Sequence, residues 1–218
     1  CDEHGILLVF DEVQSGVGRT GKMFCAEHSG VKPDIMTLAK GLGSGMPIGA
    51  VVARQSHMKK WKRGAHGNTY GGNPLCCAAA NVTLDLVREQ YAANAAKMGA
   101  HFMKRLAELK SEYPCIGDLR GRGLMIGLEL IEKDGSPARA LVDRLLHTAW
   151  RNGLLLLSCG VSTLRFMPPL CVTEAEVDEA MKDRPVALIP VGAIEAHGPH
   201  LPLSTDTVSR PATSYTAK

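Results

Sequence analysis

The sequence contains no apolar run that approaches the roughly 18 residues needed to cross a bilayer as a helix. No basic segment followed by an apolar segment occurs near its start, so no signal peptide is predicted. The formal net charge of +3 is too small to favour nucleic acid or an anionic membrane as a partner. We therefore expect small-molecule substrates, with no nucleic-acid or membrane partner.

Paired cysteine motifs are also missing. The seven cysteines are scattered, only Cys76 and Cys77 are adjacent, and no C-x-x-C spacing occurs. This pattern argues against a disulfide framework or a thiolate metal cage and favours reduced thiols in the cytoplasm. The chain also lacks an initiator methionine, since it begins at Cys1, and we interpret this as a fragment or a processed product.

Two short apolar runs near the start each end in a charged residue. Residues 6–10 lead into Asp11, and residues 35–39 lead into Lys40, with a glycine-rich connection between them. Unalternating apolar runs of this length are typical of strands buried on both faces. Open parallel sheets place their chemistry beyond the carboxyl ends of the strands, so Asp11 and Lys40 are expected at one edge. An acid for a protonated ring nitrogen and an amine for an imine are the two groups that pyridoxal phosphate requires.

The local sequence narrows this interpretation. The stretch DEVQSGVGRTGKMFCAEHSGVKPDIMTLAKGLGSGMPIGAVVA resembles the class III (ω-type) aminotransferases, and so do HGNTYGGNP and RGRGLMIGLEL further along. The resemblance extends over residues 2–183. It implies the α/β fold-type I architecture of pyridoxal-phosphate enzymes, with a mostly parallel sheet in the large domain and a small α+β C-terminal domain. It also implies transamination between an amine or ω-amino acid and a keto acid.

The same resemblance implies roles for individual residues. Lys40 would hold the cofactor as a Schiff base and move protons during the reaction, and Asp11 would pair with the pyridinium nitrogen. Val13 would pack against one face of the ring, and Gln14 would hydrogen-bond its phenolic oxygen. Thr69 would contact the cofactor phosphate of the neighbouring subunit, which implies a homodimer with the active site at its interface.

One further residue is implied to bind substrate. Arg165, within LRFMPPL, matches the arginine that commonly binds a substrate carboxylate in this family. The alternative is an arginine at a strand edge that is solvated by water.

Three domains or segments are expected. Residues 1–114 would form the C-terminal part of the cofactor-binding large domain, with a strand over 48–53 and a long or broken helical region over 74–112 that is capped by Asn73. Residues 115–183 would form the small domain, with strands near 124–130, 154–157 and 163–166 and a helix after Ser136. Residues 184–218 would form a short additional segment and a disordered tail.

That last segment contains a second candidate site. The sequence RPVALIPVGAIEAHGPHLPLSTDT resembles the start of the creatininase family of metal-dependent amidohydrolases. The resemblance implies that Glu195, His197 and Asp206 ligate a divalent metal, zinc or manganese. The family needs further ligands downstream, so this site is expected to be incomplete.

Alternatives to transamination follow from the same residues. An aminomutase or racemase of the same fold would share the motif around Lys40, whereas a truncated amidohydrolase would use the second motif. A non-catalytic remnant is a third possibility. Because the phosphate loop and the ring-stacking aromatic of the family have no counterpart here, we expect the isolated chain to bind the cofactor weakly and to turn over little substrate.

Overall fold

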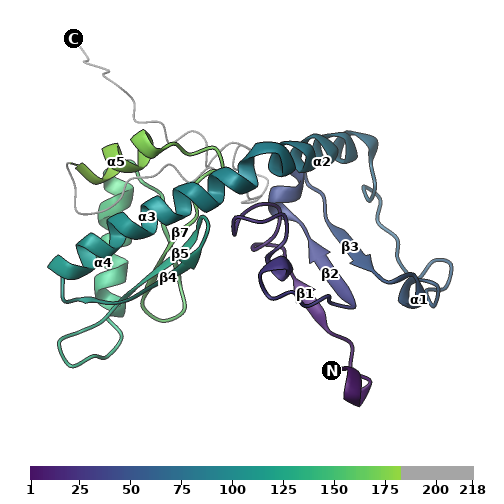
Figure 1. Ribbon diagram of the computed structural model, residues 1–218, viewed down its shortest axis with the longest axis horizontal. Coiled ribbons are helices and arrows are strands. Elements are labelled where there is room, and N and C mark those ends of the chain that lie inside the picture. Colours follow the sequence, from purple (N-terminus) through teal and green to yellow (C-terminus); the bar gives the residue numbers. More distant parts are fainter. Residues whose placement is uncertain (183–218) are drawn as a thin grey trace, which may run out of the picture. The chain divides into compact units, whose positions relative to one another are not determined.

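The computed structural model describes residues 1–182, which fall into two compact units (Figure 1). The first unit is Cys1–Ala93, and the second begins at Asn94. The elements of the first unit are η1 (Asp2–His4), β1 (Val9–Asp11), η2 (Cys25–His28), β2 (Ile35–Leu38), η3 (Lys40–Gly43), β3 (Ala50–Ala53), α1 (Gln55–Met58), α2 (Pro74–Leu86) and the π-helical turn η4 (Val87–Tyr91). The elements that follow are α3 (Ala92–Glu112), β4 (Ile116–Arg122), β5 (Met125–Leu130), α4 (Arg139–Arg151), β6 (Leu157–Cys159), β7 (Thr163–Phe166) and α5 (Glu174–Lys182).

The first unit is built on a three-stranded sheet in the order β1-β2-β3. The pairing of β1 with β2 is parallel, as predicted, while β3 runs antiparallel to β2. The prediction that these strands are buried on both faces is wrong. Val9, Val51 and Val52 are about half exposed, because no described element covers that part of the sheet.

Helix α2 supports the turn that follows β2. It begins where the sequence predicted, with Pro74 in its first turn and the Asn73 side chain accepting the Cys76 N–H at 2.9 Å. Its buried face, which includes Ala80 and Thr83, packs against η3. The Thr83 hydroxyl lies 2.9 Å from Ser44 Oγ, so the helix is tied to the end of the turn that begins at Lys40.

The second unit has a four-stranded antiparallel sheet in the order β4-β5-β7-β6. The predicted alternation of β5 is confirmed, since Ile126, Leu128 and Leu130 are buried and the residues between them are not. These side chains share a core with α3, where Phe102 packs edge-on against Phe166 at 5.4 Å between ring centroids. Strand β4 was missed by the sequence analysis.

The division between the two units differs from the predicted domain boundary. Residues 1–114 were expected to belong to one domain, but the compact units divide after Ala93. The reason is the packing of α3, whose buried residues join the core of the second sheet. The predicted helical region over 74–112 is confirmed, although a π-helical turn interrupts it at η4.

Helix α3 lies close to the backbone of Gly123 at Gly99. A Cβ atom at this position would lie 2.1 Å from the carbonyl oxygen of Gly123, in the turn between β4 and β5. We expect Gly99→Ala to destabilise the second unit by about 1–3 kcal/mol or more, because backbone rather than a flexible side chain must move. Urea unfolding would measure this loss, with Ala100→Gly, at an exposed position of the same helix, as a comparison. A Gly99→Ala midpoint at or above that of Ala100→Gly would contradict the expectation.

Asp34 fastens the start of β2 to the residues before β1. Its carboxylate accepts the Leu8 N–H at 2.9 Å and lies 3.6 Å from both Arg54 Nε and His57 Nε2. The Leu8 hydrogen bond, and then the charges of Arg54 and His57, lower the pKa of Asp34 from its usual value.

This lowered pKa predicts a pH-dependent contribution to stability. A depressed folded-state pKa stabilises the protein above the unfolded pKa of about 3.9 and loses this effect as pH falls through the folded value. Asp34→Asn is therefore expected to lower the melting temperature at pH 7, and the difference from the wild type should shrink as the pH falls through the lowered folded-state pKa. Melting curves measured from pH 7 into acid would test this, with Asp2→Asn as a control; a difference that stays constant over the whole range would contradict it.

Candidate functional site

The carboxyl ends of β1 and β2 lie side by side and carry the predicted acid and amine (Figure 1). Asp11, the last residue of β1, pairs in register with Thr37 of β2. Asp11 Oδ1 accepts the Thr37 hydroxyl at 3.2 Å and the Val13 N–H at 3.0 Å. These two bonds fix the carboxylate at the strand end, and both use Oδ1.

Lys40 follows β2 at the same edge and begins η3. Its side chain is exposed, and its backbone adopts φ +44°, a left-handed conformation that residues with a Cβ atom rarely adopt. Ser44, at the end of the same turn, also has a positive φ of +45°. Such strain persists where the surroundings enforce it, often at functional sites, and here α2 packs against the turn.

Glu12 was missed as an important residue by the sequence analysis. It follows Asp11, but its side chain is only 2% exposed. Its two oxygens accept the backbone N–H groups of Cys25 and Ala26 at 2.8 and 2.6 Å, and Oε2 also accepts the Ser15 hydroxyl at 3.2 Å. Glu12 therefore anchors η2 and the glycine-rich connection beside the site. Sequence periodicity does not reveal this role, because the role depends on contacts with Cys25 and Ala26, which lie 13 and 14 positions further along the chain.

The remaining predicted residues lie in several places. Val13 and Gln14 are partly buried and follow β1 directly. Thr69 is exposed in a turn between α1 and α2. Arg165 lies in the second unit, where it is partly buried on β7 opposite Gly127 of β5.

The predicted metal ligands lie outside the described residues. Glu195, His197 and Asp206 all follow residue 182. Their ligation stays a prediction. Among residues 1–182, no helix combines the length and the apolar character that crossing a bilayer requires.

Comparison with known families assigns most of the chain. The family model described as "Aminotransferase class-III" matches residues 1–185. The chain belongs to the class-III aminotransferase family. Its members use pyridoxal 5'-phosphate, and the fold of this chain is part of their fold-type I α/β architecture, as predicted.

Individual members of the class-III aminotransferase family are similar over the same region. An acetylornithine aminotransferase from Caldanaerobacter subterraneus subsp. tengcongensis is 45% identical over 183 residues, which cover 84% of this chain and 44% of the relative. A leucine/methionine racemase from Thermococcus litoralis is 43% identical over 199 residues, covering 88% of this chain and 45% of that protein. The structure of Plasmodium falciparum ornithine delta-aminotransferase matches with a TM-score of 0.73 and 39% identity, over 82% of this chain and 46% of that one. The chain thus spans less than half the length of these relatives.

A second family model overlaps the end of the first. The model described as "Creatinine amidohydrolase" matches residues 171–217. The match includes the three predicted metal ligands, and it overlaps the aminotransferase match over residues 171–185. It covers a small share of the chain.

The geometry at the end of β1 and β2 fits pyridoxal phosphate at two of its groups. Asp11 presents an anionic oxygen fixed by Thr37 and Val13, which suits a protonated ring nitrogen. Lys40 presents an exposed amine at the same sheet edge, which suits the cofactor's aldehyde. Thr69 carries a hydroxyl in an exposed turn, and its contact with a cofactor phosphate stays a prediction.

Proposed function

We propose that this chain carries the lysine-bearing part of a pyridoxal-phosphate site that transfers an amino group between an amine or ω-amino acid and a keto acid. The observation that carries the proposal is the placement of Asp11 and Lys40 at one edge of the parallel β1–β2 pair. The family match over residues 1–185 supports it.

Each residue would perform a defined step. When bound, the cofactor supplies an electron sink for the pair left when a substrate C–H bond breaks. Asp11 would keep the proton on the ring nitrogen through its negative charge. Lys40 Nζ would hold the cofactor at its aldehyde carbon, and its free amine would be the general base for the proton on the substrate Cα.

The relatives suggest the substrate class. The acetylornithine aminotransferase relative is 45% identical, so we propose an acetylated or free ω-amino acid as the donor. Arg165 would bind the substrate carboxylate, because its guanidinium offers a planar pair of donors. We further propose a homodimer, with Thr69 contacting the neighbouring subunit's cofactor, and a cytoplasmic location.

Reductive trapping tests this proposal directly. The chain would be combined with a separate polypeptide that comprises the part of the Caldanaerobacter relative without a counterpart here. Pyridoxal phosphate and borohydride would then be added, and the labelled peptide would be mapped by mass spectrometry. The label is expected on Lys40, and amino-group transfer from acetylornithine to a keto acid should appear in the same mixture. Label spread over surface lysines, without Lys40, would contradict the proposal.

Racemisation is a second candidate, because the leucine/methionine racemase relative is 43% identical. A racemase uses the same cofactor and lysine but needs no keto acid. Incubation of the combined polypeptides with L-leucine, without a keto acid, would produce D-leucine if this second function holds. Amino-group transfer without loss of chirality would favour the first.

A further inference from the structure

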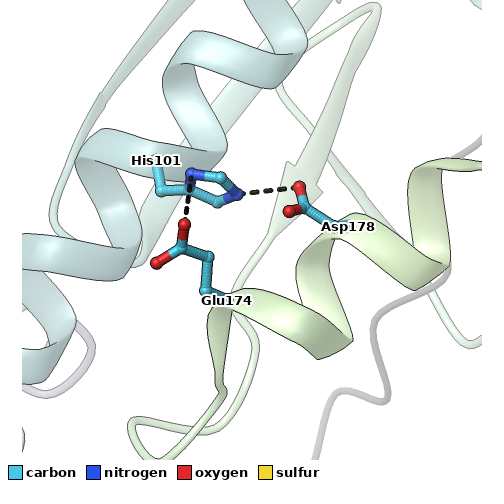
Figure 2. Close-up of side chains that lie close together, drawn as sticks. All are labelled: His101, Glu174 and Asp178. Atoms are coloured by element: carbon cyan, nitrogen blue, oxygen red, sulfur yellow. Dashed lines mark hydrogen bonds and ion pairs between the residues drawn. The ribbon is translucent and has the colours of Figure 1, made fainter.

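Helices α3 and α5 bring together a histidine and two carboxylates that the proposed site does not use. His101 lies on α3, and Glu174 and Asp178 lie on α5, from which both side chains point toward the imidazole ring (Figure 2). One ligand atom from each residue lies within 4.8 Å of the other two. The spacing of Glu174 and Asp178, four residues apart, places both carboxylates on the same face of α5.

We propose that His101, Glu174 and Asp178 bind a divalent first-row metal ion of the zinc class. One imidazole and two carboxylates are ligands that zinc accepts, with bonds of about 2.0–2.2 Å. Tetrahedral zinc therefore needs its ligand atoms about 3.3 Å apart. His101 Nε2 and Asp178 Oδ1 are already 2.9 Å apart, so a small widening of this pair would admit the ion.

Glu174 would complete the protein ligands by a movement of its side chain. Its Oε1 lies 3.9 Å from the other imidazole nitrogen, Nδ1. The Glu174 side chain is 55% exposed, so rotation toward the Nε2 side meets little resistance from packing. Water would supply the fourth ligand, and the ion would replace the proton shared between His101 and Asp178.

Two cations on α3 lie beside the carboxylates. Lys97 Nζ lies 3.8 Å from Glu174 Oε2, the oxygen that faces away from His101, and Lys97 is largely exposed. Arg105 Nε lies 3.5 Å from Asp178 Oδ1, while its Nη1 donates to Glu108 at 2.5 Å. Carboxylates that bind metals are commonly held by such outer partners. Lys97 is solvated and can move away, and Arg105 keeps Glu108 as a second partner when the ion takes Asp178 Oδ1.

The ion would fasten α5 to α3. Helix α5 lies in the stretch, residues 171–185, where the two family matches overlap. A metal there would hold the last described helix on the second unit. The proposed site uses none of the predicted ligands Glu195, His197 and Asp206.

Zinc binding to variants of the full chain tests the proposal. After treatment with EDTA, the chain would be dialysed against buffered Zn²⁺, and bound metal would be counted at several free concentrations. Glu174→Gln and Asp178→Asn are each expected to lose one equivalent of zinc, or to weaken it at least about tenfold. Glu179→Gln, an exposed carboxylate on another face of α5, should bind like the wild type.

His101→Ala adds a check on the nitrogen ligand. It should lose the same equivalent, and zinc should no longer raise its melting temperature. If His101→Ala fails to fold, the result for Glu174→Gln still tests the site, because Glu174 is exposed and its replacement should not disturb the fold. If Glu174→Gln and Glu179→Gln bind the same amount of zinc with the same affinity, the proposal is wrong. The same holds if all bound zinc proves to be held by cysteines.

Discussion

Replacement of Lys40 by alanine will abolish covalent capture of pyridoxal phosphate when the chain is combined with the missing part of a class-III aminotransferase. Lys40 is the amine that follows β2 at the edge where Asp11 ends β1. Without it, the aldehyde has no fixed partner, and the proton at the substrate Cα has no base. Loss of the general base alone should lower the rate of amino-group transfer by about 10²–10⁴-fold.

The structure predicts that this loss is chemical and not a result of unfolding. The Lys40 side chain is exposed, and alanine keeps the Cβ atom already present at the left-handed φ of +44°. The variant should therefore melt within a few degrees of the wild type. Lys32→Ala, at an exposed position in the same unit, is the matched control and should retain both capture and activity. Undiminished borohydride labelling of Lys40→Ala would show that another lysine carries the cofactor.

The sequence predicted those parts of the fold that have local signals. Asn73 and Pro74 marked the start of α2, and Thr173 and Glu176 form a capping box, another local signal, at the start of α5. Strand β7 was predicted within its observed bounds, Thr163–Phe166.

Features that depend on distant contacts could not be predicted in this way. Strand β4 contains two glycines and three charged residues, so its sequence resembles a loop, and only pairing with β5 makes it a strand. Glu12 looked like a second acid beside Asp11, but its burial depends on the backbone of η2. The approach of His101 to α5 joins positions that are 77 residues apart. Contacts between such distant positions leave no pattern in the hydrophobic periodicity or the motif spacing of the sequence.

The candidate site shows the same division. The motif predicted which residues lie at the edge, while the structure showed how Asp11 is held. Thr37 and Val13 both donate to one oxygen, and neither was predicted to do so. A substitution that keeps this oxygen can keep both hydrogen bonds while it removes the charge, so the charge of Asp11 can be tested by itself.

Asp11→Asn is expected to leave the fold intact but to remove most of the activity that the chain shows when it is combined with the missing part of a class-III aminotransferase. Asparagine keeps an oxygen that can accept the Thr37 hydroxyl and the Val13 N–H, so the end of β1 retains its local bonds. The negative charge that holds the ring proton is lost. Removal of one such electrostatic contact typically costs about 10²–10³-fold in rate, and we expect a decrease of that size in kcat.

Thr37→Val provides the converse change. It removes the hydroxyl that donates to Asp11 Oδ1 at 3.2 Å but leaves the carboxylate charge in place. If the charge is what matters, Thr37→Val should lower kcat much less than Asp11→Asn, although only Thr37→Val removes the hydrogen bond to Oδ1. Melting curves for both variants would confirm that the fold survives. A Thr37→Val enzyme as impaired as Asp11→Asn would instead mean that the position of the carboxylate limits the rate, and near-wild-type activity in Asp11→Asn would remove Asp11 from the site.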